Sequence, residues 1–127
     1  MSMECIATDK APAAIGPYSQ AVKAGDFLFV SGQLPMDPAS GELIEGSIED
    51  KARQVLSNAQ AIVQAAGADL TRVAKATVFL KDMKDFMAVN GVYAEFFQAH
   101  LPARSAIQVA GLPKGADVEV ELIVYVG

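Results

Sequence analysis

The side chains best suited to chemistry are one arginine and two glutamates near the C-terminus. Arg104 follows Pro102-Ala103, and its planar guanidinium could bind a substrate carboxylate through two parallel hydrogen bonds. Glu119 and Glu121 stand two residues apart, and a single glutamate could act as a general base on a water molecule. The alternative is a structural ion pair between Arg104 and one of these glutamates, because ion-pair networks resemble functional sites. The pattern alone leaves both interpretations open.

The other polar residues do not form a familiar catalytic set. Ser31 has no histidine in its vicinity, and the single histidine, His100, follows a predicted helix, so a Ser-His-Asp triad is not expected. We expect Ser31 to donate a hydrogen bond to substrate or to backbone. Tyr18 is either a ligand contact or a buried aromatic residue with a bonded hydroxyl. Asn90 is more typical of a solvated or capping amide.

Composition and charge exclude several classes of protein. The formal charge of −5, with ten scattered basic residues, argues against nucleic-acid binding. One cysteine and one histidine cannot supply a typical zinc site, and no phosphate-binding glycine motif occurs, so we expect no metal and no organic cofactor. The longest apolar run, 122–126, falls far short of the roughly 20 residues of a membrane helix. Charged residues occupy the start of the chain, where a signal peptide needs an apolar run, which predicts a cytoplasmic protein.

The chain, residues 1–127, reads as a single domain with two helices. Apolar residues at three-and-four spacing predict a helix from Ile48 to Ala66, with Ser47 as its N-cap and Gly67 as its stop. A second helix begins near Asp82 or Asp85 and ends before Pro102. Its apolar stripe consists of Phe86, Val89, Tyr93 and Phe96.

Six apolar runs predict strands, and Gly25-Asp26 predicts a hairpin between two of them. The predicted strands are 5–8, 18–23, 27–33, 73–81, 104–110 and 118–126. Strands followed by helix, strand, helix and strands predict an α+β fold with both helices on one face of the sheet.

Alternation along the strands assigns side chains to the two faces of the sheet. Val118, Val120, Leu122, Val124 and Val126 make an apolar face that we assign to the helices, so Glu119 and Glu121 point the other way. The same parity puts Ile107 and Val109 on the helix side and leaves Arg104, Ala106 and Gln108 opposite. Ser31 and Gln33 are expected to share a face with Phe27 and Phe29. A far face that mixes polar and aromatic residues favours a homo-oligomer with sites at its interfaces.

Four segments together resemble the RidA/YjgF family. They are Ala13-Ala14-Ile15-Gly16-Pro17-Tyr18-Ser19-Gln20, Ser31-Gly32-Gln33, Asn90-Gly91-Val92-Tyr93 with Phe96-Phe97, and Pro102-Ala103-Arg104-Ser105 through Val118-Glu119. The likeness covers nearly the whole chain. The Pro-Ala-Arg-Ser stretch followed at this spacing by a glutamate is its most specific part.

The resemblance implies a chorismate-mutase-like α+β fold, a mixed β-sheet with two helices on one face, assembled as a homotrimer with clefts between subunits. It also implies hydrolytic deamination of 2-aminoacrylate, 2-iminopropanoate and 2-iminobutanoate to 2-keto acids and ammonia, a form of metabolite damage control without a cofactor. Arg104 would hold the substrate carboxylate, and Glu119 would orient or deprotonate the attacking water. Tyr18, Ser31 and Asn90 match the remaining site positions of the family.

One position departs from the family pattern: Ala106 stands where many members have cysteine. A backbone contact with substrate at Ala106 would survive the change, whereas thiol chemistry there is excluded. Two other functions remain open, namely a regulatory trimer that binds a 2-keto acid without turnover and the endoribonuclease or translation-inhibitor activity associated with some relatives. A secondary chaperone activity would require exposed apolar surface.

Overall fold

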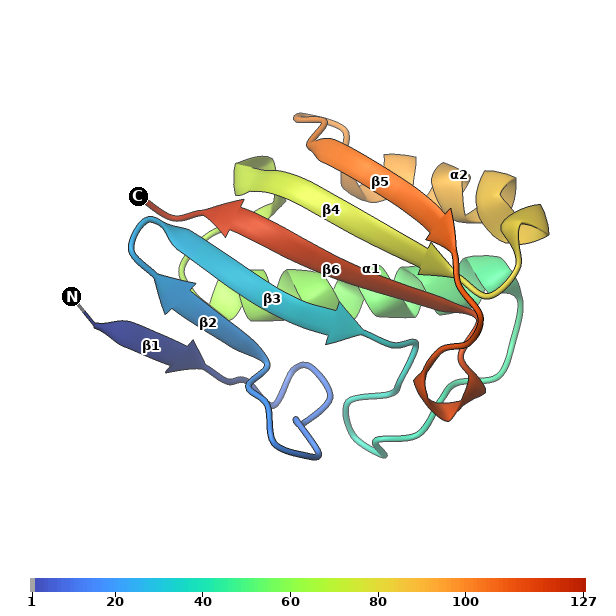
Figure 1. The fold of residues 1–127 in the computed structure, drawn as a ribbon, viewed down its shortest axis with the longest axis horizontal. Coiled ribbons are helices and arrows are strands. Elements are labelled where there is room, and N and C mark those ends of the chain that lie inside the picture. The colour runs from blue at the N-terminus through green and yellow to red at the C-terminus, as the bar shows by residue number, and fades with distance from the viewer. Residues whose placement is uncertain (1) are drawn as a thin grey trace.

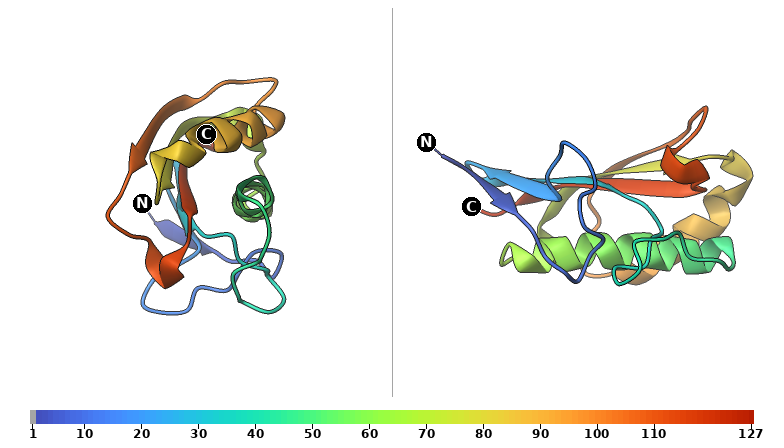
Figure 2. Two further views of the ribbon diagram at one scale, coloured as in Figure 1. Left: turned by 90° about the vertical axis from the view of Figure 1, so that its right-hand side faces the viewer. Right: turned by 90° about the horizontal axis from the view of Figure 1, so that it is seen from below.

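A computed structural model describes residues 2–127, which form one six-stranded sheet with two helices against one of its faces. Figure 1 looks onto the sheet with the longer helix behind it, and Figure 2 shows that both helices lie on the same side. The predicted α+β class with both helices on one face is confirmed. None of the helices in residues 2–127 is long and apolar enough to cross a membrane.

The sheet is mixed, with neighbours in the order β1-β2-β3-β6-β4-β5. Its strands are β1 (Met3–Ile6), β2 (Ala21–Ala24), β3 (Phe27–Gln33), β4 (Val73–Leu80), β5 (Ala103–Gln108) and β6 (Val118–Tyr125). All neighbouring strands are antiparallel except β4 and β5, which are parallel. Parallel neighbours need a long crossover connection, and α2 lies in the connection between these two strands. β2 and β3 form the predicted hairpin, with Gly25 in a left-handed conformation at φ +60°.

The longer helix, α1 (Ile48–Ala65), begins and ends where the sequence predicts. The Ser47 hydroxyl accepts a hydrogen bond from the Asp50 N–H, and the Asp50 carboxylate accepts one from the Ser47 N–H, so two free donors of the first turn are satisfied. Gly67, with φ +84°, follows the last turn. The apolar stripe of α1 is buried against β3 and β6.

The second helix is α2 (Phe86–Phe96). It begins directly after Asp85, the later of its two predicted starts. A three-residue 3-10 turn, Met83–Asp85, precedes it, and the Asp82 carboxylate accepts the Lys84 N–H there. Asp85 makes no side-chain cap to α2. The helix packs across α1 and lies beside the edge strand β5 (Figure 1).

The core lies between the sheet and the helices, and β6 supplies its centre. Val118, Val120, Leu122 and Val124 are all at most 1% exposed, so the predicted helix-facing side of this strand is confirmed. Leu28 and Val30 of β3 face the same way, also as predicted. Glu119 and Glu121 consequently point to the outer face, where no helix covers them.

The predicted faces of β5 are wrong. Arg104 pairs in register with Ala76, which is fully buried beneath the helices, so Arg104 and Ala106 lie on the helix side. Ile107 is on the outer face and is 44% exposed. The prediction assumed that the apolar residues of β5 face the helices. β5 is an edge strand, and the outer face of the sheet is itself apolar, so apolar side chains of β5 also occur on that outer face.

Gln33 is likewise not on the face predicted for it. The pairing of β3 with β6 shifts register between Val30 and Gln33, as at a β-bulge, so alternation is interrupted. Gln33 turns inward and is 6% exposed, whereas Ser31 and Gly32 both remain accessible from the outer face. The irregularity therefore presents two consecutive residues on one side of the sheet.

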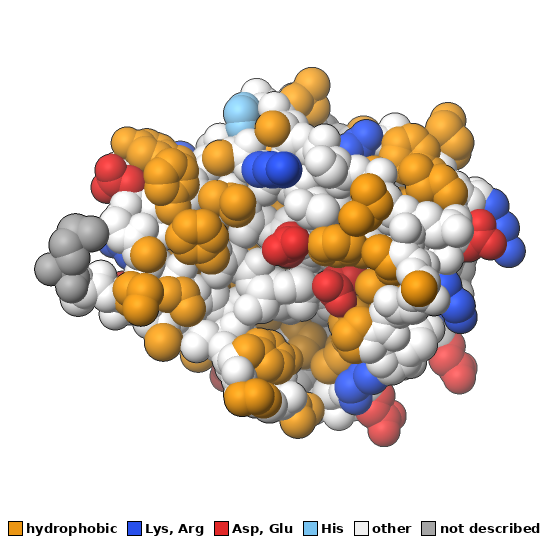
Figure 3. Space-filling view, in the orientation of Figure 1, with side chains coloured by type: hydrophobic (Ala, Val, Ile, Leu, Met, Phe, Trp, Pro, Cys, Tyr) orange, Lys and Arg blue, Asp and Glu red, His pale blue; other side chains and the backbone are white. Residues whose placement is uncertain are grey.

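The outer face of the sheet carries large hydrophobic side chains that no helix covers. Phe27, Phe29, Ile107 and Tyr125 are each between 41% and 47% exposed. Figure 3 shows hydrophobic side chains gathered over this face, with acidic groups near its middle. Exposed aromatic residues on one contiguous surface are typical of an interaction surface.

The capping box at the start of α1 can be tested by substitution. We expect Ser47→Ala to lower the free energy of unfolding by about 0.5–2 kcal/mol, because the Asp50 N–H loses its acceptor. Urea unfolding followed by circular dichroism measures the loss. The matched control is Ser57→Ala on the exposed side of the same helix, which should be neutral or slightly stabilising. Equal effects at the two positions would contradict the capping assignment.

Candidate functional site

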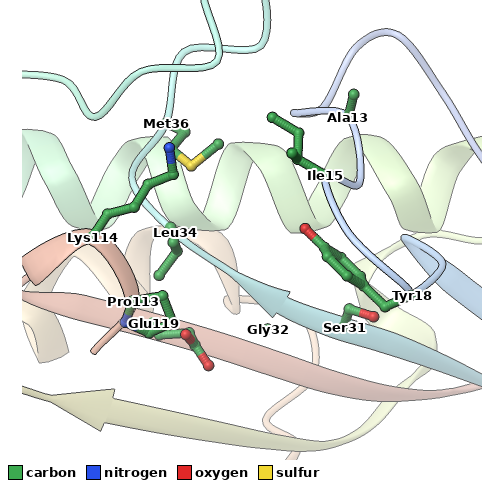
Figure 4. A pocket seen from close by; sticks show the side chains of 10 residues that line it. All are labelled: Ala13, Ile15, Tyr18, Ser31, Gly32, Leu34, Met36, Pro113, Lys114 and Glu119. Carbon is green, nitrogen blue, oxygen red and sulfur yellow. The ribbon is translucent and has the colours of Figure 1, made fainter. Parts of the chain in front are cut away.

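A pocket of about 460 Å³ opens on the outer face beside the irregular end of β3. Figure 4 shows Tyr18 and Ser31 on one side of it and Glu119 on the other, with Gly32 between them. The complete lining is Ala13, Ile15, Tyr18, Ser31, Gly32, Leu34, Met36, Pro113, Lys114 and Glu119. Three predicted site residues, Tyr18, Ser31 and Glu119, are thus brought together from distant parts of the chain.

The loop between β1 and β2 supplies Tyr18, and one buried glutamine shapes this loop. Gln20 is 4% exposed, its amide nitrogen donates to the Thr8 and Pro12 carbonyls, and its amide oxygen accepts from the Thr8 N–H at 2.7 Å. Burial of a fully bonded amide ties both ends of the loop together. Tyr18 itself is 53% exposed, so the alternative of a buried aromatic residue is wrong for it.

Ser31 stands in the irregular part of β3 and is half-buried. Its hydroxyl donates to the Ser19 carbonyl at 2.6 Å, while its backbone N–H donates to the Gln20 carbonyl at 2.9 Å. Of the two partners expected for this hydroxyl, the proton therefore goes to backbone. The hydroxyl oxygen retains lone pairs that could accept a hydrogen bond from a ligand.

Glu119 is the one carboxylate in the lining, and its environment disfavours ionisation. Burial, and secondarily the like charge of Glu121, raise the pKa of the Glu119 carboxyl above its ordinary value. The side chain lies against Gly32, where an added Cβ would approach the Glu119 Cδ to 2.8 Å. A side chain at this position would displace the Glu119 carboxylate from its place beside β3. A carboxylate with a raised pKa in an apolar pocket is suited to general-base chemistry.

Lys114 lines the same pocket, and the sequence reasoning missed it. It lies in a short turn with φ +59°, the one positive φ among the non-glycine residues of 2–127, and Gly115 follows with φ +70°. Figure 4 shows its side chain extending toward Met36. The Pro-Lys-Gly sequence was a turn signal that could have placed this residue between β5 and β6.

The other predicted site residues gather elsewhere, at the edge formed by β5 and α2. The Arg104 guanidinium donates from Nη1 to the Asn90 Oδ1 at 2.7 Å, and Asn90 lies in the middle of α2, so it is not a capping amide. Ala106 follows two residues later on the same side of β5 and is partly buried. Within residues 2–127, Arg104 makes no salt bridge with any carboxylate, and the alternative of an ion pair with Glu119 or Glu121 is wrong within the chain.

The candidate residues therefore form two groups on opposite faces of one sheet. Tyr18, Ser31 and Glu119 lie at the pocket on the outer face, whereas Arg104 and Asn90 lie on the helix side at the β5 edge. No ligand can touch Arg104 and Glu119 of the same chain through the sheet. In the part of the chain that the structure describes, no three His, Cys, Asp or Glu side chains gather to hold a metal ion.

Comparisons with known proteins agree on the family. The model of the family described as Endoribonuclease L-PSP matches residues 8–126. The chain is 57% identical over 122 residues to a protein of the goat Capra hircus named 2-iminobutanoate/2-iminopropanoate deaminase, covering 96% of this chain and 89% of the relative.

Two solved structures from E. coli have the same fold. One is that of TdcF with bound serine, with a TM-score of 0.91 and 45% identity, covering 96% of this chain and 98% of that one. The other is that of the YjgF gene product, with a TM-score of 0.91 and 46% identity over the same shares of the two chains. The chain belongs to the Endoribonuclease L-PSP family, which is the RidA/YjgF family.

Proposed function

We propose that the protein hydrolyses reactive 2-imino acids, namely 2-iminopropanoate, formed from 2-aminoacrylate, and 2-iminobutanoate, to 2-keto acids and ammonia. Two observations support the proposal. One group of residues contains a half-buried carboxylate, Glu119, with a raised pKa, and the other contains a guanidinium, Arg104, that pairs with no carboxylate of residues 2–127. A base for water and a cation for a substrate carboxylate are the two groups that this hydrolysis needs.

The proposal requires an assembly, because one chain keeps these two groups on opposite faces of its sheet. In a homotrimer, the β5 edge of one copy would close over the pocket of the next, so that Arg104 of one subunit meets Glu119 of its neighbour. Such head-to-tail contacts close into a ring when the rotation is one third of a turn. The uncovered hydrophobic residues Phe27, Phe29, Ile107 and Tyr125 supply apolar area for burial between subunits.

The chemistry follows from these positions. Arg104 binds the carboxylate and thereby fixes C2 of the imine beside Glu119 of the neighbouring subunit. Glu119 accepts a proton from water as the water oxygen forms a bond to C2, which gives a tetrahedral carbinolamine. That proton passes to the nitrogen, which leaves a neutral carbinolamine with a hydroxyl and an amine on C2. Glu119 then moves the hydroxyl proton to the amine as the C2=O double bond forms and the C–N bond breaks, so that the 2-keto acid and ammonia leave. No oxidant or reductant is needed.

The relatives support the same choice of substrate. The goat relative bears the name of an imine deaminase, and TdcF binds serine, an amino acid whose carboxylate presents the same two oxygens as a 2-imino acid. The Endoribonuclease L-PSP description of the family offers RNA as another substrate. A formal charge of −5 opposes binding to a polyanion, so we favour the small carboxylate.

The first experiment couples threonine dehydratase to this protein and follows the disappearance of 2-iminobutanoate. We expect the wild type to accelerate it, and Arg104→Ala to lower kcat/KM by about two to four orders of magnitude through loss of two charge-assisted hydrogen bonds. Full activity of Arg104→Ala would overturn the proposal. Binding of 2-oxobutanoate without any acceleration would instead indicate a regulatory binding protein. RNA cleavage by a nuclease-free preparation would support the endoribonuclease.

Mixing two inactive variants tests the shared site. Trimers assembled from equal amounts of Arg104→Ala and Glu119→Gln should recover about a quarter of the wild-type activity, since half of the arginines and half of the glutamates are intact and meet at random. The two chains are unfolded together and refolded, and each variant refolded alone is the control. If both residues served one chain's own site, the mixture would remain as inactive as its components.

The dependence of kcat/KM on pH should show, on its acid side, the titration of Glu119. The base acts when deprotonated, so kcat/KM falls as the pH drops through the raised pKa of Glu119. Glu121→Gln removes a like charge and should move this acid limb to lower pH, while burial keeps part of the shift. Glu4→Gln, on β1 at the far edge of the sheet, is the control that should leave the limb in place. An unmoved limb in Glu121→Gln would argue against Glu119 as the titrating base.

A further inference from the structure

Arg104 is held by one stripe of α2. Phe86, Asn90 and Tyr93 are spaced four and three residues apart, so their side chains project from the same side of the helix toward β5. The Arg104 Cζ lies 4.8 Å from the centroid of the Tyr93 ring and 5.5 Å from that of the Phe86 ring. Both distances are within the range of cation–π attraction. The guanidinium thus has two aromatic neighbours and one amide neighbour, all from α2.

These contacts leave the binding edge of the arginine free. A guanidinium has five N–H donors in one plane, and Asn90 uses a single one of them, on Nη1. Aromatic rings attract the cation without accepting any of the remaining donors in its plane. The pair of parallel N–H groups needed for a carboxylate therefore stays available.

We propose that Tyr93 and Phe86 are positioning residues that hold the Arg104 guanidinium in its carboxylate-binding orientation before substrate arrives. The inference rests on the proposed function, because it concerns the same arginine. Arg104 is on an exposed edge strand, where a long side chain would otherwise lose much rotational freedom on binding. Restraining it in advance lowers that cost at the moment of binding.

The ring of Tyr93, and not its hydroxyl, is the part that serves Arg104. The hydroxyl oxygen is buried and has no hydrogen-bond partner in residues 2–127, and the whole residue is 6% exposed. Burial raises the pKa of this phenol, which keeps it neutral. Phenylalanine at position 93 would therefore preserve the stack, whereas leucine would remove it.

The test is the affinity for 2-oxobutanoate measured by calorimetry, together with KM and kcat for 2-iminobutanoate. Tyr93→Leu should weaken binding and raise KM by about three- to thirtyfold with a smaller change in kcat, the range expected for a lost cation–π contact. Tyr93→Phe should restore most of that affinity. Phe86→Leu, at a half-buried position, tests the second ring if Tyr93→Leu folds poorly.

A matched control separates positioning from loss of stability. Val92→Ala removes buried volume next to Tyr93 in the same helix, at a residue that is 1% exposed, without touching the arginine. It should lower the Tm and leave KM unchanged. If Tyr93→Leu and Phe86→Leu raise KM no more than Val92→Ala does, the inference is overturned.

A double-mutant cycle then shows whether Tyr93 acts through Arg104. In an Arg104→Ala background, Tyr93→Leu should cause no further loss of 2-oxobutanoate affinity, because the partner of the ring is gone. Additive losses would overturn the positioning role. Retained binding and turnover in Arg104→Ala alone would refute the proposed function itself. Loss in Arg104→Ala with no effect of either aromatic variant would refute only this inference.

Discussion

The positions of the candidate residues depend on one constraint: the two helices cover only one face of the sheet (Figure 2). Alternation along β6 buries Val118, Val120, Leu122 and Val124 beneath α1, and the same alternation forces Glu119 and Glu121 outward. The outer face therefore combines ionisable groups with aromatic side chains that remain 41% to 47% exposed. Exposure of these apolar side chains to water is unfavourable, and association with another surface would bury them.

Interruptions of regular structure shape the pocket on the outer face. The register shift in β3 presents Ser31 and Gly32 together, and the absence of a side chain at Gly32 lets the Glu119 carboxylate lie close to the strand. The buried Gln20 amide holds the loop that brings Tyr18 over the same place. The Gln20 amide is bonded through both its nitrogen and its oxygen, so the loop buries this polar group without leaving it unsatisfied.

The side chains of Glu119 and Arg104 lie in different surroundings. Glu119 is half-buried and lies near Glu121, and burial first, then this like charge, raise the pKa of its carboxyl above the ordinary value. Arg104 lies at an open edge, against two aromatic rings and an amide. A base needs a pKa near the working pH, whereas a carboxylate clamp needs a permanent charge in a fixed orientation. Separate faces of the sheet allow both conditions within one chain.

The sequence by itself determined the two helices, the α+β class, the capping of α1 and the helix-facing side of β6, because local spacing and parity govern these features. The bounds of the first two strands were wrong, since β1 is Met3–Ile6 and not 5–8, and Tyr18, placed in a strand over 18–23, lies in the loop before β2. Residue types made Arg104 and the pair Glu119 and Glu121 candidates, and the resemblance to the RidA/YjgF family chose Glu119 from that pair. Only the tertiary structure decided the faces of β5 and of Gln33, since an edge strand beside an apolar outer face and a β-bulge both defeat simple alternation. The same applies to Lys114 in the pocket and to the aromatic neighbours of Arg104, because contacts between distant segments depend on how the sheet is paired.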